Sequence, residues 1–186
     1  SQWRAEHGGE REIYFAQEHP PGRLGLSDFT VADELDISLG GLAFPHRLYQ
    51  FALAHSGWRH ARVVLGGESF QSLAAGLQDA LWMAGGVPQE HRTDSLSAAF
   101  NNLAEREELT ARYQALCKHY GMHPTRNNTG VSHENGAIEA RQGSLKRALD
   151  QGLLLRGSRE FDDLAAYEQF VAETVRRLNA RCVRSW

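Results

Sequence analysis

The hydrophobic spacing of this chain changes after Gly67, from successive strands to helices that alternate with short strands, and this change limits the possible folds most. The first part of the chain predicts three strands in succession, over Leu24–Val31, Phe44–Ser56 and Trp58–Gly67. The last two strands are joined tightly at Ser56-Gly57. Sequential strands with short connections favour an antiparallel meander.

After Gly67 the pattern alternates between helices and short strands. Helices are expected over four stretches: Phe70–Ala84, Glu105–Tyr120, Asn135–Leu155 and Asp162–Cys182. Gly85-Gly86 ends the first helix, and Asp162 or Asp163 caps the last one. Short strands are expected over Val87–Thr93 and Met122–Asn127, with a possible extra edge strand over Glu12–Gln17. The polar stretch Asn128–His133 reads as a mobile loop, and Trp58 and Trp82 as core or hairpin packing.

Strands that first form a meander and then alternate with helices give a mixed sheet with helices on its faces. The expected class is therefore α/β. This order of elements resembles the ribonuclease H-like fold, a five-stranded mixed sheet flanked by helices. We expect an N-terminal extension over residues 1–22 and one domain over residues 23–186.

Charge and composition narrow the functional classes only slightly. The net charge is -3, but residues 141–186 carry nine Lys or Arg against six Asp or Glu. This basic bias suits a polyanion partner, although a solvated helical surface explains it as well. No apolar run reaches the ~18 residues of a membrane span. Two cysteines are too few for a disulfide framework, which favours a reducing compartment.

Three acidic residues occupy positions where a carboxylate is less ordinary. Asp28 lies inside the first strand, where Asp is rare and needs a partner. Asp94 directly follows a strand, although it could simply cap the next helix. Glu139 lies one turn into a long helix. It is favoured over Glu134, because Glu134 would lie at the helix start, where the helix dipole favours an acidic residue for structural reasons alone.

These three carboxylates could form one site without His or Cys ligands. Such a hard oxygen site suits Mg²⁺ or Mn²⁺. Two ions ~4 Å apart can activate a water or a 3′-hydroxyl in phosphodiester chemistry. Lys146 lies seven residues after Glu139, on the same helical line beside the apolar Leu145 and Leu149. A cation there could hold a DNA backbone, although a scattered charged face gives the same pattern.

The motifs "GLSDFT", "HRTDSLSAA" and "HENGAIE" together resemble the catalytic core of DDE transposases and retroviral-type integrases. The resemblance is closest to the IstA-like bacterial insertion-sequence transposases, and it extends from about Glu12 to the last helix. It implies that Asp28, Asp94 and Glu139 ligate two Mg²⁺ or Mn²⁺ ions. It also places Lys146 against DNA.

His133 and Arg147, which flank the same helical stretch, complete the expected DNA contacts; a solvated loop histidine is the alternative for His133. The resemblance implies DNA 3′-end nicking and strand transfer by a homo-oligomer on DNA. It further implies an ATP-hydrolysing helper protein, N-terminal helix-turn-helix elements and a cytoplasmic, nucleoid-associated location in bacteria. The alternatives are a ribonuclease H-like nuclease without strand transfer and an inactive interaction module.

Overall fold

The computed structural model describes residues 20–93, 103–125 and 132–182, with side chains from residues 107 and 143 onward in the last two stretches. Four helices and one 3₁₀ turn are present in this part of the chain: η1 (Asp33–Leu35), α2 (Phe70–Ala84), α3 (Leu103–Tyr120), α4 (Ser132–Arg156) and α5 (Leu164–Cys182). The strands are β1 (Leu24–Val31), β2 (Ser38–Leu39), β3 (Leu42–Ala43), β4 (Arg47–Leu53), β5 (Arg59–Val64), β6 (Glu90–Thr93), β7 (His123–Thr125) and β8 (Glu160–Phe161).

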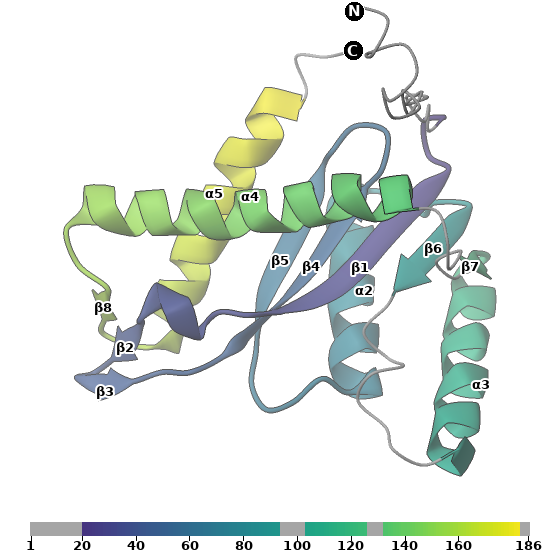
Figure 1. Cartoon of the computed structure of the whole chain (residues 1–186), viewed down its shortest axis with the longest axis horizontal. Coiled ribbons are helices and arrows are strands. Elements are labelled where there is room, and N and C mark those ends of the chain that lie inside the picture. Colours follow the sequence, from purple (N-terminus) through teal and green to yellow (C-terminus); the bar gives the residue numbers. More distant parts are fainter. Residues whose placement is uncertain (1–19, 94–102, 126–131, 183–186) are drawn as a thin grey trace, which may run out of the picture.

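The main sheet has five strands in the order β5-β4-β1-β6-β7. The meander β1-β4-β5 is antiparallel, as the short connections predicted, whereas β6 and β7 add in parallel on the other side of β1. β1 is therefore the central strand, with one antiparallel and one parallel neighbour (Figure 1). This mixed sheet with flanking helices confirms the predicted α/β, ribonuclease H-like fold.

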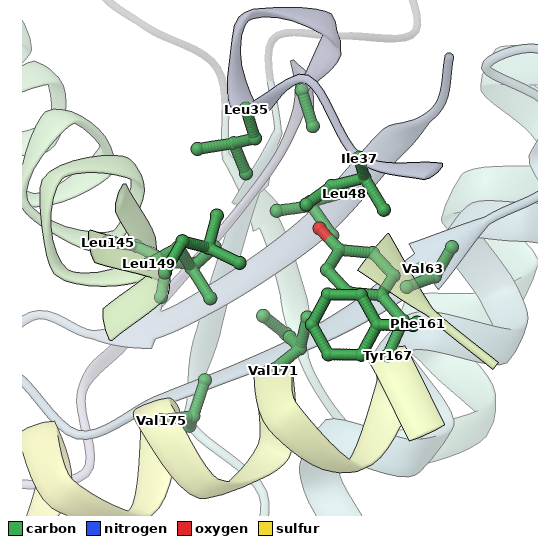
Figure 2. Packing of buried hydrophobic residues seen from close by; sticks show 13 residues of the cluster. Leu35, Ile37, Leu48, Val63, Leu145, Leu149, Phe161, Tyr167, Val171 and Val175 are labelled. Carbon is green, nitrogen blue, oxygen red and sulfur yellow. The ribbon is translucent and has the colours of Figure 1, made fainter. Parts of the chain in front are cut away.

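One side of the sheet, called here the α4 face, is covered by α4 and α5. Figure 2 shows Leu145 and Leu149 of α4 and Val171 of α5 meeting Leu48 of β4 over this face. Leu48 and Leu149 are fully buried in this cluster. Burying one such leucine side chain contributes about 1.5–3 kcal/mol. The predicted apolar stripe of α4 is thus confirmed at Leu145 and Leu149.

The opposite side, called the α2 face, packs against α2 and α3. Its buried cluster joins Tyr49 of the sheet to Leu73 and Leu77 of α2 and to Leu109 of α3. α2 approaches the sheet closely because Gly76 has no side chain: a Cβ atom there would lie 2.4 Å from the ring of Tyr49. The helix ends as predicted, with Gly85 in the left-handed conformation at φ 71°.

A second, three-stranded sheet in the order β3-β2-β8 was not predicted. Its strands have two residues each, too short for any alternation to be visible in the sequence. The Glu160 carboxylate fastens this sheet by accepting hydrogen bonds from the Ser38 hydroxyl and from the Gly41 amide. The small sheet lies beyond the C-terminal end of α4 (Figure 1).

Two sequence predictions on the helices were wrong. α4 begins at Ser132, three residues before the expected start, so His133 belongs to the helix and not to a loop. A single glycine such as Gly136 costs a helix only about 1 kcal/mol, which a helix of 25 residues can tolerate. Trp82 was expected to be packed but is 77% exposed, because α2 buries Leu77 and Leu81 instead.

Other predictions on the helices are confirmed or lie outside the described residues. Asp163 caps α5, with its Oδ1 accepting a hydrogen bond from the Ala166 amide at 2.8 Å. Trp58 packs against Phe51 in the α2-face cluster. The proposed edge strand Glu12–Gln17 lies outside the described part. No described helix is both long and apolar enough to cross a membrane.

Candidate active site

Asp28 lies on the central strand and points to the α4 face. Its neighbours Ser27 and Phe29 both lie on the α2 face, where Ser27 bonds to Tyr49 and Phe29 packs in the cluster. Because successive side chains of a strand alternate, Asp28 lies on the other side. Its side chain is only partly buried. The sequence prediction of an acidic residue inside this strand is therefore confirmed in position.

The strand that leads to Asp94 runs parallel to β1 and ends beside Asp28. Its last described residue, Thr93, is in register with Ser27, which directly precedes Asp28. Asp94 follows Thr93 in the sequence but lies outside the described residues. The register thus brings the chain to the neighbourhood of Asp28 one residue before the predicted second carboxylate.

α4 crosses the same face of the sheet and is tied to β5. The Arg59 guanidinium donates from Nη1 to the Ser144 hydroxyl of α4 at 2.7 Å. The backbone of Arg59 exchanges two hydrogen bonds with the Asn179 side chain of α5, at 2.9 and 2.8 Å. Backbone position 139 lies in α4, five residues or about 7.5 Å along the axis before Ser144. The Glu139 side chain lies outside the described part.

No group of three or more His, Cys, Asp or Glu side chains that could hold a metal is found in the described part of the chain. Of the three predicted ligands, only the Asp28 side chain is described. The donor set itself, carboxylates without sulfur or imidazole, matches the hard oxygen ligands that Mg²⁺ and Mn²⁺ prefer. Asp28 fits that chemistry because it is a carboxylate residue that is not fully buried on the central strand of the sheet.

A buried polar network fixes β1 against β6 directly behind Asp28. Ser27 Oγ lies 2.6 Å from the Tyr49 hydroxyl and 2.7 Å from His91 Nε2. His91 Nδ1 in turn lies 2.8 Å from the Tyr113 hydroxyl of α3. Because every member finds a partner, the network can be buried at low cost and it specifies one register for the two strands.

Burial also sets the charge state of this network. His91 is fully buried, and burial lowers its pKa to about 3, so its imidazole is neutral at physiological pH. Burial raises the pKa values of Tyr49 and Tyr113, so both phenols remain protonated. The network therefore acts as a neutral support on the α2 face, on the other side of the sheet from Asp28.

The basic residues predicted to contact DNA are placed differently from one another. Lys146 forms an ion pair with Glu34 of η1, across the junction of α4 and the turn after β1. Arg147 is exposed. The backbone of His133 is in the first turn of α4, and its side chain lies outside the described part. Lys146 thus lies on α4 two turns after position 139, as its spacing predicted, and Arg147 follows it directly.

Sequence reasoning missed the polar residues that surround Asp28 in space. Gln50 is the cross-strand partner of Asp28, and Arg59 lies on the same face of the next strand. His91 supports the site from the other face. The available signal was a polar residue in a strand interior, Gln50 in β4 and His91 in β6, whereas Arg59 is the first residue of β5 and gives no such signal. Their relation to Asp28 depends on strand register, which the sequence pattern does not give.

Comparison with protein-family models finds no match. A protein of Sinorhizobium fredii (strain NBRC 101917 / NGR234), called "Uncharacterized protein y4jA/y4nE/y4sE", is 56% identical over 180 residues. The match covers 96% of this chain but only 36% of that relative, so the chain spans about a third of its length.

Three solved structures with the same fold come from retroviral proteins. A chain of the simian T-cell lymphotropic virus intasome in complex with PP2A regulatory subunit B56 gamma aligns with a TM-score of 0.60 at 16% identity. The alignment covers 87% of this chain and 50% of that one. The HTLV-2 integrase catalytic core domain in complex with magnesium, in dimeric and trimeric forms, aligns with a TM-score of 0.54 at 17% identity, covering 86% of each chain. The chain therefore has the fold of integrase catalytic cores.

Proposed function

We propose that this chain is the catalytic core of a bacterial DNA transposase of the IstA-like insertion-sequence group. The observation that carries the proposal is the position of Asp28. Its carboxylate lies on the central strand, faces α4, and stands beside the end of the parallel strand that continues into Asp94. The integrase-core fold supports the same conclusion, because that fold is found in a protein whose structure contains magnesium.

In this proposal Asp28, Asp94 and Glu139 are the metal ligands. The bound divalent ions would supply Lewis-acid activation of a water or a 3′-hydroxyl and would stabilise the leaving oxygen. The rigid central strand holds Asp28, and the network around His91 fixes the neighbouring strand in register. α4 carries Glu139 over the same face and is anchored there through Ser144.

The reaction would proceed in two steps on DNA. Water would first cleave the phosphodiester bond at a transposon end and leave a free 3′-hydroxyl. That hydroxyl would then attack a target phosphodiester, joining the transposon end to the target strand and releasing a target 3′-hydroxyl. Lys146, Arg147 and His133 would bind the DNA backbone along α4, because they lie within eight residues of Glu139 on that helix.

The partners follow from the proposed family. They are transposon-end and target DNA, further copies of this chain on the DNA, and an ATP-hydrolysing helper protein. The location would be the bacterial cytoplasm, associated with the nucleoid.

The proposal is tested by incubating the chain with Mn²⁺, a plasmid target and a labelled duplex that represents a pre-cut element end. We expect joined products, and we expect Asp28→Asn, Asp94→Asn and Glu139→Gln each to abolish joining with unchanged circular dichroism. Asp162→Asn, a matched loss of an exposed carboxylate near the small sheet, should leave joining intact. Cleavage of the plasmid or the duplex without joined products would favour a nuclease instead. Full activity in the Asp94→Asn variant would refute the assignment.

A further inference from the structure

The burial of Gln50 is not explained by the contacts of its side chain. It is the middle residue of β4, a strand between two others, and its side chain is 9% exposed. Glutamine is uncommon among buried residues unless its polar atoms are paired. The side-chain nitrogen of Gln50 is buried and has no hydrogen-bond acceptor among the residues that the structure describes.

An unpaired buried amide is unfavourable. Leaving such a donor without an acceptor costs about 1–3 kcal/mol. The positions that flank Gln50 on the same face, Leu48 and the cross-strand Ala61, are apolar and buried. A methionine of similar size would fill the space without that cost. Packing alone therefore does not account for Gln50, whereas an acceptor that the amide reaches only during function would.

The register identifies that acceptor. Gln50 is directly opposite Asp28 in the antiparallel ladder, and directly opposed residues share one face of the sheet. Their Cβ atoms are then about 4.5–5.5 Å apart, which is within reach of a glutamine amide. A carboxylate that ligates a metal through one oxygen can accept a hydrogen bond at the other. Such outer partners hold a ligand in its binding orientation.

We infer that Gln50 is a positioning residue of the proposed metal site, whose amide donates a hydrogen bond to the Asp28 carboxylate when Asp28 binds a divalent ion. This inference rests on the proposed function, because it assigns Gln50 a role toward the Asp28 ligand. It adds a fourth residue, on a strand that carries none of the three predicted ligands.

The test is Mn²⁺ titration of the chain and of Gln50→Met, followed by calorimetry or by Mn²⁺ electron paramagnetic resonance. Loss of a partner of this kind weakens metal binding about 10- to 100-fold. We therefore expect at least a tenfold higher Kd in Gln50→Met. Thermal stability without metal should be equal or higher, because the unpaired amide is removed. Gln71→Met, the same change at an exposed position of α2, should alter neither quantity.

A pH series separates positioning from packing. A hydrogen bond to the ionised carboxylate favours that form, so its loss raises the carboxyl pKa. The pH at which half of the Mn²⁺ binding is lost should therefore be higher in Gln50→Met than in the unchanged protein. Unchanged Mn²⁺ affinity and pH midpoint would overturn the inference, as would a loss of stability with an unmoved midpoint.

The outcome for the unchanged protein separates the two proposals. If it binds Mn²⁺ and Asp28→Asn does not, the metal site stands whatever Gln50→Met shows. If the unchanged protein binds no Mn²⁺ at millimolar concentration, the proposed function fails and the role of Gln50 fails with it.

Discussion

Lys146 on α4 is paired with Glu34 of η1, the turn that follows the strand carrying Asp28. The lysine side chain is 23% exposed and the glutamate side chain 65%. An ion pair this exposed contributes about 0–1 kcal/mol, so a DNA phosphate could replace the glutamate at little cost. In the proposed transposase, Glu34 would compete with DNA for Lys146.

Glu34→Gln should therefore strengthen DNA binding. The ion pair that competes with DNA contributes up to about 1 kcal/mol. Its removal should therefore lower the Kd for duplex DNA about two- to fivefold at low salt. Fluorescence anisotropy measures the change. Lys146→Ala should instead weaken binding and reduce the slope of log K against log salt by about 1.

The matched control for that experiment is Glu168→Gln on α5, an exposed residue with the same change in charge. Equal effects of Glu34→Gln and Glu168→Gln would mean that only net charge matters. The pair with Lys146 would then have no part in DNA binding.

Two glycines in helices should respond in opposite ways to alanine. At Gly76 a Cβ atom would lie 2.4 Å from Tyr49, so Gly76→Ala should lower the free energy of unfolding by about 1–3 kcal/mol despite a better helix propensity. At Gly143 a Cβ atom would have its nearest neighbour 4.0 Å away, on Arg147. Gly143→Ala should therefore raise the free energy of unfolding by up to about 1 kcal/mol. Urea denaturation measures both; a neutral or stabilising Gly76→Ala would show that α2 can move away from the sheet.

Stability should fall in acid partly because of His91. Burial lowers its pKa to about 3, whereas the ordinary value is 6.5. Between these values the unfolded chain binds a proton that the folded chain does not, so the free energy of unfolding decreases as pH drops below about 6.5. One such group gives a slope of at most about 1.4 kcal/mol per pH unit.

His91→Gln isolates this contribution. Burial also lowers the pKa values of His46 and His60, so the unchanged protein has a steeper dependence than one histidine gives. The variant should be less stable at pH 7, since it loses contacts to Ser27 and Tyr113, but its dependence on pH between 6.5 and 4 should be flatter. Parallel curves for the two proteins would show that His91 does not titrate in this range.

The periodic elements could be predicted from the sequence because their apolar residues repeat. β1 and α2 have the predicted bounds, and the mixed sheet follows from the order of the elements. The small sheet could not be predicted, because two-residue strands have no period and are held by long-range bonds such as that from Ser38 to Glu160. The exposure of Trp82 was not expected from its residue type, since a large apolar side chain is usually packed, but α2 turns Leu77 and Leu81 toward the sheet and leaves Trp82 outside.

The candidate site was predictable only in part. An aspartate inside a strand is unusual enough to single out Asp28, and the structure places it on the central strand. Asp94 and the Glu139 side chain lie outside the described part, so their roles remain predictions. Gln50 could not be found in the same way, because its importance lies in the β1–β4 register, which arises from packing on both faces of the sheet.

The most direct test of the central claim is anomalous diffraction from crystals of the chain grown or soaked with Mn²⁺. The proposed function predicts a manganese peak about 2.0–2.2 Å from a carboxylate oxygen of Asp28, with Asp94 and Glu139 among the other ligands and no peak in Asp28→Asn. An ordered structure with no manganese at Asp28, and with Asp94 and Glu139 directed away from it, would contradict the claim.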